Sequence, residues 1–268
     1  MAGCINPIRC NTSSLKGNTT LAVDSWAMNR KVRLHYLDNQ CDMSDLPLVM
    51  IPGLRSTAKE FLPTIEAITP QRAISVSLRG RGKSDVPDTG YRFEDHVEDI
   101  AAIVDQAQFQ QVCLFGHSIG INYAIGYALE NPDRVKGIIV GGYPAEYPIF
   151  TSDWALKVMM KYPTEMPMKA VLGIQYESAQ ISLWERLSQL TCPILVLRGG
   201  KPSSLLKPEI AAKYVQYAPQ SHILGFNDSG HRLWHPNLNR FVAALRFFVE
   251  ECSLPKSPDT GDGEHLPE

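Results

Sequence analysis

The chain has 268 residues, of which 44% are hydrophobic and 20% charged, an ordinary composition for one globular domain with a small insertion. The formal net charge of −2 gives no indication of binding to nucleic acid or to an anionic membrane. No run of about 18 apolar residues is present, so we expect no transmembrane helix and no membrane partner. The first residues lack the apolar stretch of a secretory signal, and the six cysteines are scattered, which favours a cytoplasmic protein with reduced thiols.

Short apolar runs alternate with segments of helical periodicity along most of the chain. This alternation predicts an α/β fold, with a mostly parallel eight-stranded sheet and helices on both faces. An opening hairpin is expected at 20–24 and 32–37. The remaining strands are expected at 48–51, 73–78, 112–115, 138–140, 194–197 and 222–226. The helices are expected at 93–104, 119–130, 208–217 and 238–249.

Two parts of the chain do not follow this alternation. The segment 146–186 is helical, holds four of the eight methionines and is inserted between two predicted strands. We interpret it as a lid over a core formed by residues 20–145 and 187–252. The tail, 253–268, is rich in Pro, Asp and Gly, a composition typical of disorder.

A short motif predicts the catalytic nucleophile. Gly116-His117-Ser118-Ile119-Gly120 follows the apolar strand 112–115 and opens the helix 119–130. This strand–turn–helix setting is the one in which Gly-x-Ser-x-Gly raises a serine hydroxyl above a sheet. The glycines let strand and helix approach closely, and the helix N-terminus favours developing negative charge. The pattern therefore indicates Ser118 as a nucleophile.

Several motifs together resemble those of the alpha/beta hydrolase superfamily, over roughly residues 21–250. Pro52-Gly53-Leu54 is similar to the family's oxyanion loop, and Ser229-Gly230-His231 to the late Gly-His that supplies its catalytic histidine. The segment 77–84 resembles the family's Asp-x-Arg-Gly-x-Gly-x-Ser loop, with Ser77 in place of the usual Asp. The resemblance implies the alpha/beta hydrolase fold and acyl-transfer chemistry.

The same resemblance supplies the other parts of the site. A serine hydroxyl needs a general base, and His231 lies in the loop between the last strand and the last helix, at the edge of the sheet expected for Ser118. The side chain of His117 is expected to point away from the turn. By resemblance, the backbone N–H groups of Leu54 and Ile119 form the oxyanion hole. Arg55 follows directly and is a candidate for substrate binding.

The acid of the triad is the missing part of this pattern. The loop 198–204, where the family commonly places it, contains no carboxylate. A branch of the family places an Asp shortly before a proline after the preceding strand, but Gly141-Gly142-Tyr143-Pro144 has glycine there. Glu146 is the nearest carboxylate and our candidate for the acid. Asp228 ranks second and Asp153 third.

These observations leave three functions open. The first is a serine hydrolase of the esterase or thioesterase type that acts on a small hydrophobic acyl substrate. The second is a non-hydrolytic lyase or cyclase, and the third is a ligand-binding protein with a degraded triad. The methionine-rich lid favours an apolar substrate, with Trp154 and Met159 as candidate contacts.

No metal-ligand spacing or dinucleotide motif is present, so we expect no metal and no cofactor. The oligomeric state stays open.

Overall fold

The computed structural model describes residues 22–41 and 46–254. The first residues of the predicted hairpin and nearly all of the predicted tail lie outside these ranges. Within them, the predicted mostly parallel sheet of eight strands is confirmed. Its strands are β1 (Val23–Asn29), β2 (Val32–Asp38), β3 (Leu48–Ile51), β4 (Ala73–Ser77), β5 (Val112–His117), β6 (Val135–Gly141), β9 (Ile194–Gly199) and β10 (Ser221–Phe226).

The order of the strands brings the predicted site loops together. It runs β1-β2-β4-β3-β5-β6-β9-β10, with β1 and β2 antiparallel to their neighbours and the rest parallel. β5, which carries the nucleophile motif, lies centrally between β3 and β6. Because parallel strands end at the same edge of a sheet, the loops after β3, β5, β6 and β10 meet at one edge.

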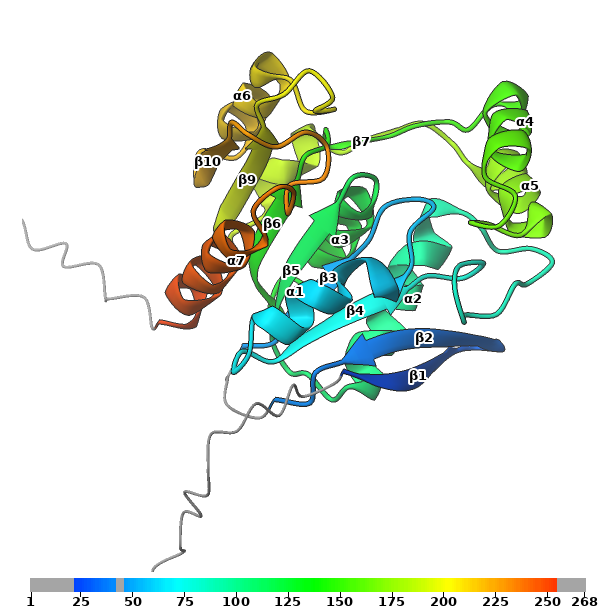
Figure 1. The fold of residues 1–268 in the computed structure, drawn as a ribbon, viewed down its shortest axis with the longest axis horizontal. Coiled ribbons are helices and arrows are strands. Elements are labelled where there is room, and N and C mark those ends of the chain that lie inside the picture. Colours follow the sequence, from blue (N-terminus) through cyan, green and yellow to red (C-terminus); the bar gives the residue numbers. More distant parts are fainter. Residues whose placement is uncertain (1–21, 42–45, 255–268) are drawn as a thin grey trace, which may run out of the picture.

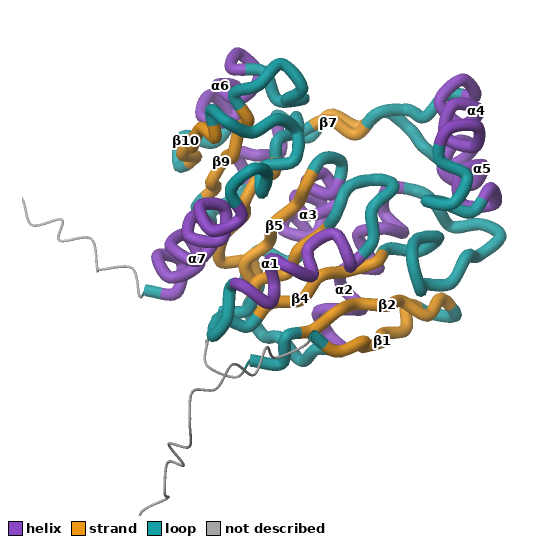
Figure 2. Tube along the Cα trace, in the orientation of Figure 1, coloured by secondary structure: helices purple, strands orange, loops and turns teal. Residues whose placement is uncertain are grey.

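Helices cover both faces of the sheet (Figures 1 and 2). They are α1 (Leu62–Ala67), α2 (Phe93–Gln106), α3 (Gly120–Glu130), α6 (Pro208–Tyr217) and α7 (Leu238–Ser253), and a short 3-10 helix, η1 (Ala58–Phe61), precedes α1. Two apolar clusters fill the space between helices and sheet. One holds residues of α2, α3 and α6, and the other holds residues of α1 and α7. Burial of both faces explains why the central strands read as continuous apolar runs.

The inserted segment, residues 146–186, leaves and re-enters the core through a short antiparallel pair. β7 (Glu146–Tyr147) pairs with β8 (Ile181–Ser182), and η2 (Glu185–Gln189) leads back to the sheet. Between them lie two helices, α4 (Ser152–Lys161) and α5 (Met168–Glu177), which Figure 1 shows packed together at one end of the molecule. Its description as a lid stays a prediction.

The inserted segment is fixed to the core through the loop after β4. The Glu177 carboxylate accepts hydrogen bonds from the backbone N–H groups of Gly90 and Tyr91. Gly173 of α5 lies against the Tyr91 ring so closely that a Cβ there would be 2.3 Å from a ring carbon. These contacts hold α5 at a defined distance from the sheet.

Candidate active site

Ser118 lies on the tight turn between β5 and α3. Its φ of +54° is in the left-handed region, which few non-glycine residues adopt. Close approach of helix and strand requires the glycines on both sides. A Cβ at Gly116 would lie 2.4 Å from Ile121 Cα, and one at Gly120 would lie 2.4 Å from the Ile51 carbonyl oxygen. Such strain in a turn between a strand and a helix is typical of functional sites, where it presents the side chain.

We expect Gly120→Ala to lower the melting temperature by roughly 2–12 °C, because overpacking costs about 1–3 kcal/mol and each kcal/mol is worth about 2–4 °C in a chain of this size. The added methyl would meet the backbone oxygens of Ile51 and Pro52, at 2.4 and 2.6 Å, and neither can turn aside as a side chain would. Thermal unfolding followed by circular dichroism measures the change. Gly225→Ala is the control, since its Cβ would meet only Asn227 Oδ1, at 3.4 Å. Equal melting temperatures for the two variants would contradict this reading of the turn.

The loop after β3 lies against the nucleophile. A Cβ at Gly53 would be 3.7 Å from Ser118 Oγ, so the backbone of this loop approaches the hydroxyl directly. The next residue, Leu54, has its carbonyl oxygen held by Arg81, whose Nε donates to it at 3.0 Å. No recorded bond among the described residues uses the N–H of Leu54 or of Ile119 as donor. Both N–H groups therefore remain available for an oxyanion.

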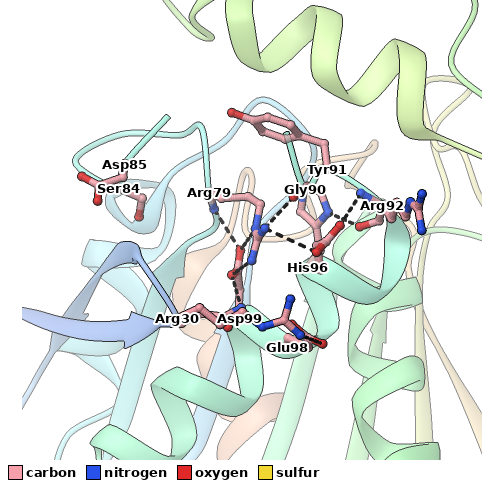
Figure 3. A network of polar contacts seen from close by, with 12 residues as sticks. Arg30, Arg79, Ser84, Asp85, Gly90, Tyr91, Arg92, His96, Glu98 and Asp99 are labelled. Atoms are coloured by element: carbon pink, nitrogen blue, oxygen red, sulfur yellow. Dashed lines mark hydrogen bonds and ion pairs between the residues drawn. The ribbon is translucent and has the colours of Figure 1, made fainter. Parts of the chain in front are cut away.

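A buried network supports the loop that carries Arg81. Arg79 donates from Nε and Nη2 to the fully buried carboxylate of Asp99, at 2.9 and 2.5 Å, and from Nη1 to the Gly90 carbonyl oxygen (Figure 3). Arg81 donates to His96 Nε2, which accepts because His96 Nδ1 donates to the Arg92 carbonyl oxygen. The motif that resembles the family loop thus acts as a rigid support behind the oxyanion loop.

His231 lines the same cavity as Ser118. No hydrogen bond joins Ser118 Oγ to His231 among the described residues, and such bonds often shorten only when substrate binds. The pKa of His231 is lowered to about 4, mainly by burial, with His117 and Arg232 adding to this effect and the Glu60 carboxylate opposing it. A neutral imidazole at physiological pH is the form that can accept a proton from the serine.

The prediction that the side chain of His117 points away from the site is wrong. Its ring lies 4.5 Å from that of His231 between centroids, and its Nε2 donates to the His231 carbonyl oxygen at 3.0 Å. Burial lowers the pKa of His117 to about 4, so the ring is neutral at physiological pH. His117, beside Ser118 in the chain, therefore holds the loop of His231 in place.

The low pKa of His231 predicts the pH dependence of the reaction. We expect kcat/KM for an activated ester to rise as the pH increases through about 4 and then to stay level towards neutral pH. The sign follows from the role of the imidazole, because protonation below this pKa removes the base. Initial rates, with circular dichroism at each pH to exclude unfolding, measure the profile. An acid limb near the ordinary histidine value of about 6.5 would contradict it.

The three carboxylates considered from the sequence do not contact His231 in the described structure. Glu146 accepts a hydrogen bond from the Trp184 indole at 2.7 Å, and Asp228 pairs with Arg240 at 3.3 Å. Asp153 lies on α4 and is exposed. His231 Nδ1 is buried and has no hydrogen-bond partner among the described residues. A role for Glu146 as the acid requires a movement of the inserted segment and stays a prediction.

Gly142 occupies the position that faces this unpaired nitrogen. A Cβ built on Gly142 would lie 3.9 Å from His231 Nδ1 and 3.8 Å from a Leu233 methyl, with no closer contact. A side-chain carboxylate at this position would therefore reach His231. Gly141 offers no such space, since a Cβ there would lie 2.6 Å from the Gly116 carbonyl oxygen.

The site opens into a cavity of about 1060 Å³. Its lining includes Leu54 and Arg55 from the loop after β3 and Thr164, Glu165 and Pro167 from the turn between α4 and α5. Arg55 pairs with Glu165 and its guanidinium lies 3.6 Å above the Tyr162 ring, so it joins the core to the inserted segment. Trp154 and Met159 are not among the lining residues. They pack against an apolar cluster that includes residues of the inserted segment itself, and the Trp154 ring lies 4.5 Å from that of Phe150 between centroids.

Of the charged residues that line the cavity, the sequence predicted Arg55 and missed Lys59, Glu60, Glu165 and Arg232. Glu60 lies on η1, lines the cavity with Ser118 and His231, and has a side chain only 15% exposed. It precedes the serine in the chain, whereas the family order places the acid between serine and histidine. Its position shortly after the oxyanion loop was the feature of the sequence that could have indicated its place in the cavity.

No group of three potential metal ligands occurs among residues 22–41 and 46–254. No helix in this part of the chain is long and apolar enough to cross a membrane.

The fold and the turn at Ser118 define the class of protein. The chain has the alpha/beta hydrolase fold, and residues 47–176 match a family model described as alpha/beta hydrolase fold. Solved structures share the fold across most of the chain. An esterase from Exiguobacterium antarcticum superposes with a TM-score of 0.71 at 20% identity, covering 85% of this chain and 100% of that one. The crystal structure of E-2-(acetamidomethylene)succinate hydrolase gives 0.68 at 18% identity, covering 85% and 99%.

Curated relatives match over a shorter stretch. A segment of 93 residues is 30% identical to the 2-(acetamidomethylene)succinate hydrolase of Mesorhizobium japonicum and covers 34% of each chain. A segment of 131 residues is 29% identical to the 2-hydroxy-6-oxononadienedioate/2-hydroxy-6-oxononatrienedioate hydrolase of Escherichia coli, covering 46% of this chain and 44% of that one. The match thus spans less than half the length of these relatives.

Proposed function

We propose that the chain is a serine hydrolase that cleaves an ester or thioester through an acyl-enzyme. The observation that carries this proposal is the strained Ser118 at the end of β5, in one cavity with His231 and the loop of Gly53 and Leu54. The curated relatives and the structural neighbour, which are hydrolases and an esterase by name, support the same reaction class.

The proposed reaction has two steps. Ser118 Oγ attacks the carbonyl carbon while His231 accepts the hydroxyl proton, and the N–H groups of Leu54 and Ile119 stabilise the oxyanion. His231 then protonates the leaving group, which departs and leaves an ester on Ser118. Water attacks that ester while His231 accepts its proton, and His231 then returns the proton to Ser118 Oγ as the acid is released. Activated esters and thioesters suit this site best, because no carboxylate contacts His231 Nδ1.

The cavity indicates a substrate with both an apolar and a polar part. Trp234, Leu205 and Leu238 offer apolar surface, whereas Arg55, Lys59 and Arg232 carry positive charge. We propose that the acyl chain packs on the apolar residues and that Arg55 binds a polar group of the substrate. Direct contacts from Trp154 and Met159 would require the inserted segment to move.

Hydrolysis of a panel of p-nitrophenyl esters and acyl thioesters by the purified chain tests the proposal. We expect turnover of short activated esters and a transient mass increase equal to one acyl group. Absence of both would favour the second candidate, a lyase or cyclase in which His231 moves protons without an acyl-enzyme. We keep that candidate because His231 Nδ1 has no hydrogen-bond partner among the described residues.

A further inference from the structure

The base of the proposed reaction becomes a cation when it accepts the serine proton. In a partly buried site this imidazolium needs a negative charge nearby. Glu146 and Asp228 are engaged with Trp184 and Arg240, and Gly142 has no side chain. With the inserted segment in this position, a negative charge must come from another part of the fold, or the base works without one.

The packing of the neighbouring Phe61 determines where Glu60 lies relative to His117 and the loop of His231. The neighbouring Phe61 is fully buried, and its ring packs edge-on against Trp234 at 5.0 Å and against His117 at 6.2 Å between centroids. This contact fixes η1 beside the loop of His231. Glu60, on the same turn, faces the cavity that Ser118 and His231 line.

The Glu60 carboxylate is mostly buried but weakly partnered. Its side chain is 15% exposed, and its recorded partner is Arg232 Nε, at 3.8 Å, on a side chain that is 66% exposed. Burying a carboxylate without good hydrogen bonds is costly, and such groups are frequent at functional sites. Arg232 directly follows His231, so the pair lies beside the base.

We propose that Glu60 is the positioning carboxylate of this site, which stabilises the His231 imidazolium in place of a conventional triad acid. This inference rests on the proposed function. Among the described residues, His117 from β5, Glu60 from η1 and Arg232 from its own loop act on the charge of His231. The other charged or titratable residues of the shared cavity are Arg55, Lys59, Glu165 and His235. Of the three groups that act on His231, Glu60 is the one whose charge favours the protonated imidazole. Its action is electrostatic and comes from the cavity side, whereas a triad acid would bond to Nδ1.

The test compares the full chain with Glu60→Gln and Glu60→Asp, and Glu98→Gln is the control. Glu98 lies on α2 and pairs with the exposed Arg30, outside the cavity. We expect Glu60→Gln to lower kcat by about tenfold, with KM within about threefold, since Gln keeps the shape and loses the charge. Glu60→Asp should retain part of the rate, and Glu98→Gln should match the wild type.

A second readout separates this inference from the proposed function. Histidine resonances followed by NMR during a pH titration report the midpoint of His231 without any turnover. We expect Glu60→Gln to move that midpoint to lower pH and Glu98→Gln to leave it in place. An unchanged midpoint, or an unchanged kcat in an active wild type, would overturn the role of Glu60. A shifted midpoint in a chain that hydrolyses no ester would overturn the proposed function and leave the electrostatic coupling standing.

Discussion

Ser118→Ala is expected to lower kcat for an activated ester by about 10⁴-fold or more, because the acyl-enzyme can no longer form. Alanine keeps the backbone turn at a φ of +54°, where it is about as strained as serine, so the fold should be retained. Initial rates measured against a buffer blank give the effect, and thermal unfolding of the variant gives the control.

Residual activity of Ser118→Ala above about one per cent of wild type would contradict the assignment of the nucleophile. A matched control is Ser188→Ala, since Ser188 is exposed on η2 and its hydroxyl donates only to the Glu185 carbonyl oxygen. That variant should retain full turnover.

Gly142→Asp is expected to raise kcat by about 10- to 100-fold, less than the roughly 10⁴ that an optimised triad acid contributes. Its carboxylate would start from a Cβ 3.9 Å from His231 Nδ1 and would give that nitrogen an acceptor. Asp tolerates the φ of +68° better than most residues, at a cost of roughly 1–2 kcal/mol. The new charge should also raise the pKa of His231, moving the acid limb of the rate profile from about 4 to higher pH.

Gly142→Asn is the matched control for this gain of activity. Asn adopts the same left-handed backbone and has nearly the same volume, but it carries no charge. Steady-state rates and pH profiles of the two variants, measured on the same ester, give the comparison. If Asp and Asn behave alike, the space beside Gly142 is not an acid position.

The sequence predicted the sheet well because its central strands are buried on both faces. The runs at 48–51 and 112–115 are short, apolar and followed by glycine-containing turns, and both lie within strands of the structure. The helix 208–217 was predicted with its observed bounds, since Pro208 at its first position marks the start. The strand predicted at 138–140 runs from Val135 to Gly141 in the structure. The prediction was too short because polar Lys136 and small Gly137 interrupt the apolar run in the sequence.

The site could be predicted only where a short sequence motif determines the local structure. The turn of Ser118 depends on glycines next to it in the chain, so Gly-x-Ser-x-Gly was sufficient to propose it. The surroundings of His231 depend on Glu60, His117 and Gly142, which come from three other elements. No local sequence pattern predicts contacts between residues so far apart in the chain. The orientation of His117 was predicted wrongly for this reason.

The predicted substrate contacts show the same limit. The apolar side chains of 146–186 were interpreted as a substrate surface. In the structure, Trp154 and Met159 pack in an apolar cluster that includes the inserted segment's own residues, whereas Thr164, Glu165 and Pro167 line the cavity. Composition identifies an apolar helix face and does not say what covers it.

Labelling of the purified chain with a fluorophosphonate tests the central claim most directly. The probe forms a covalent adduct only with a serine activated by a base in an oxyanion-stabilising site. The account predicts one adduct per chain by intact mass, mapped by peptide sequencing to the fragment that contains Ser118, and a strongly reduced labelling rate in His231→Ala. No adduct, or an adduct on a residue other than Ser118, would contradict it.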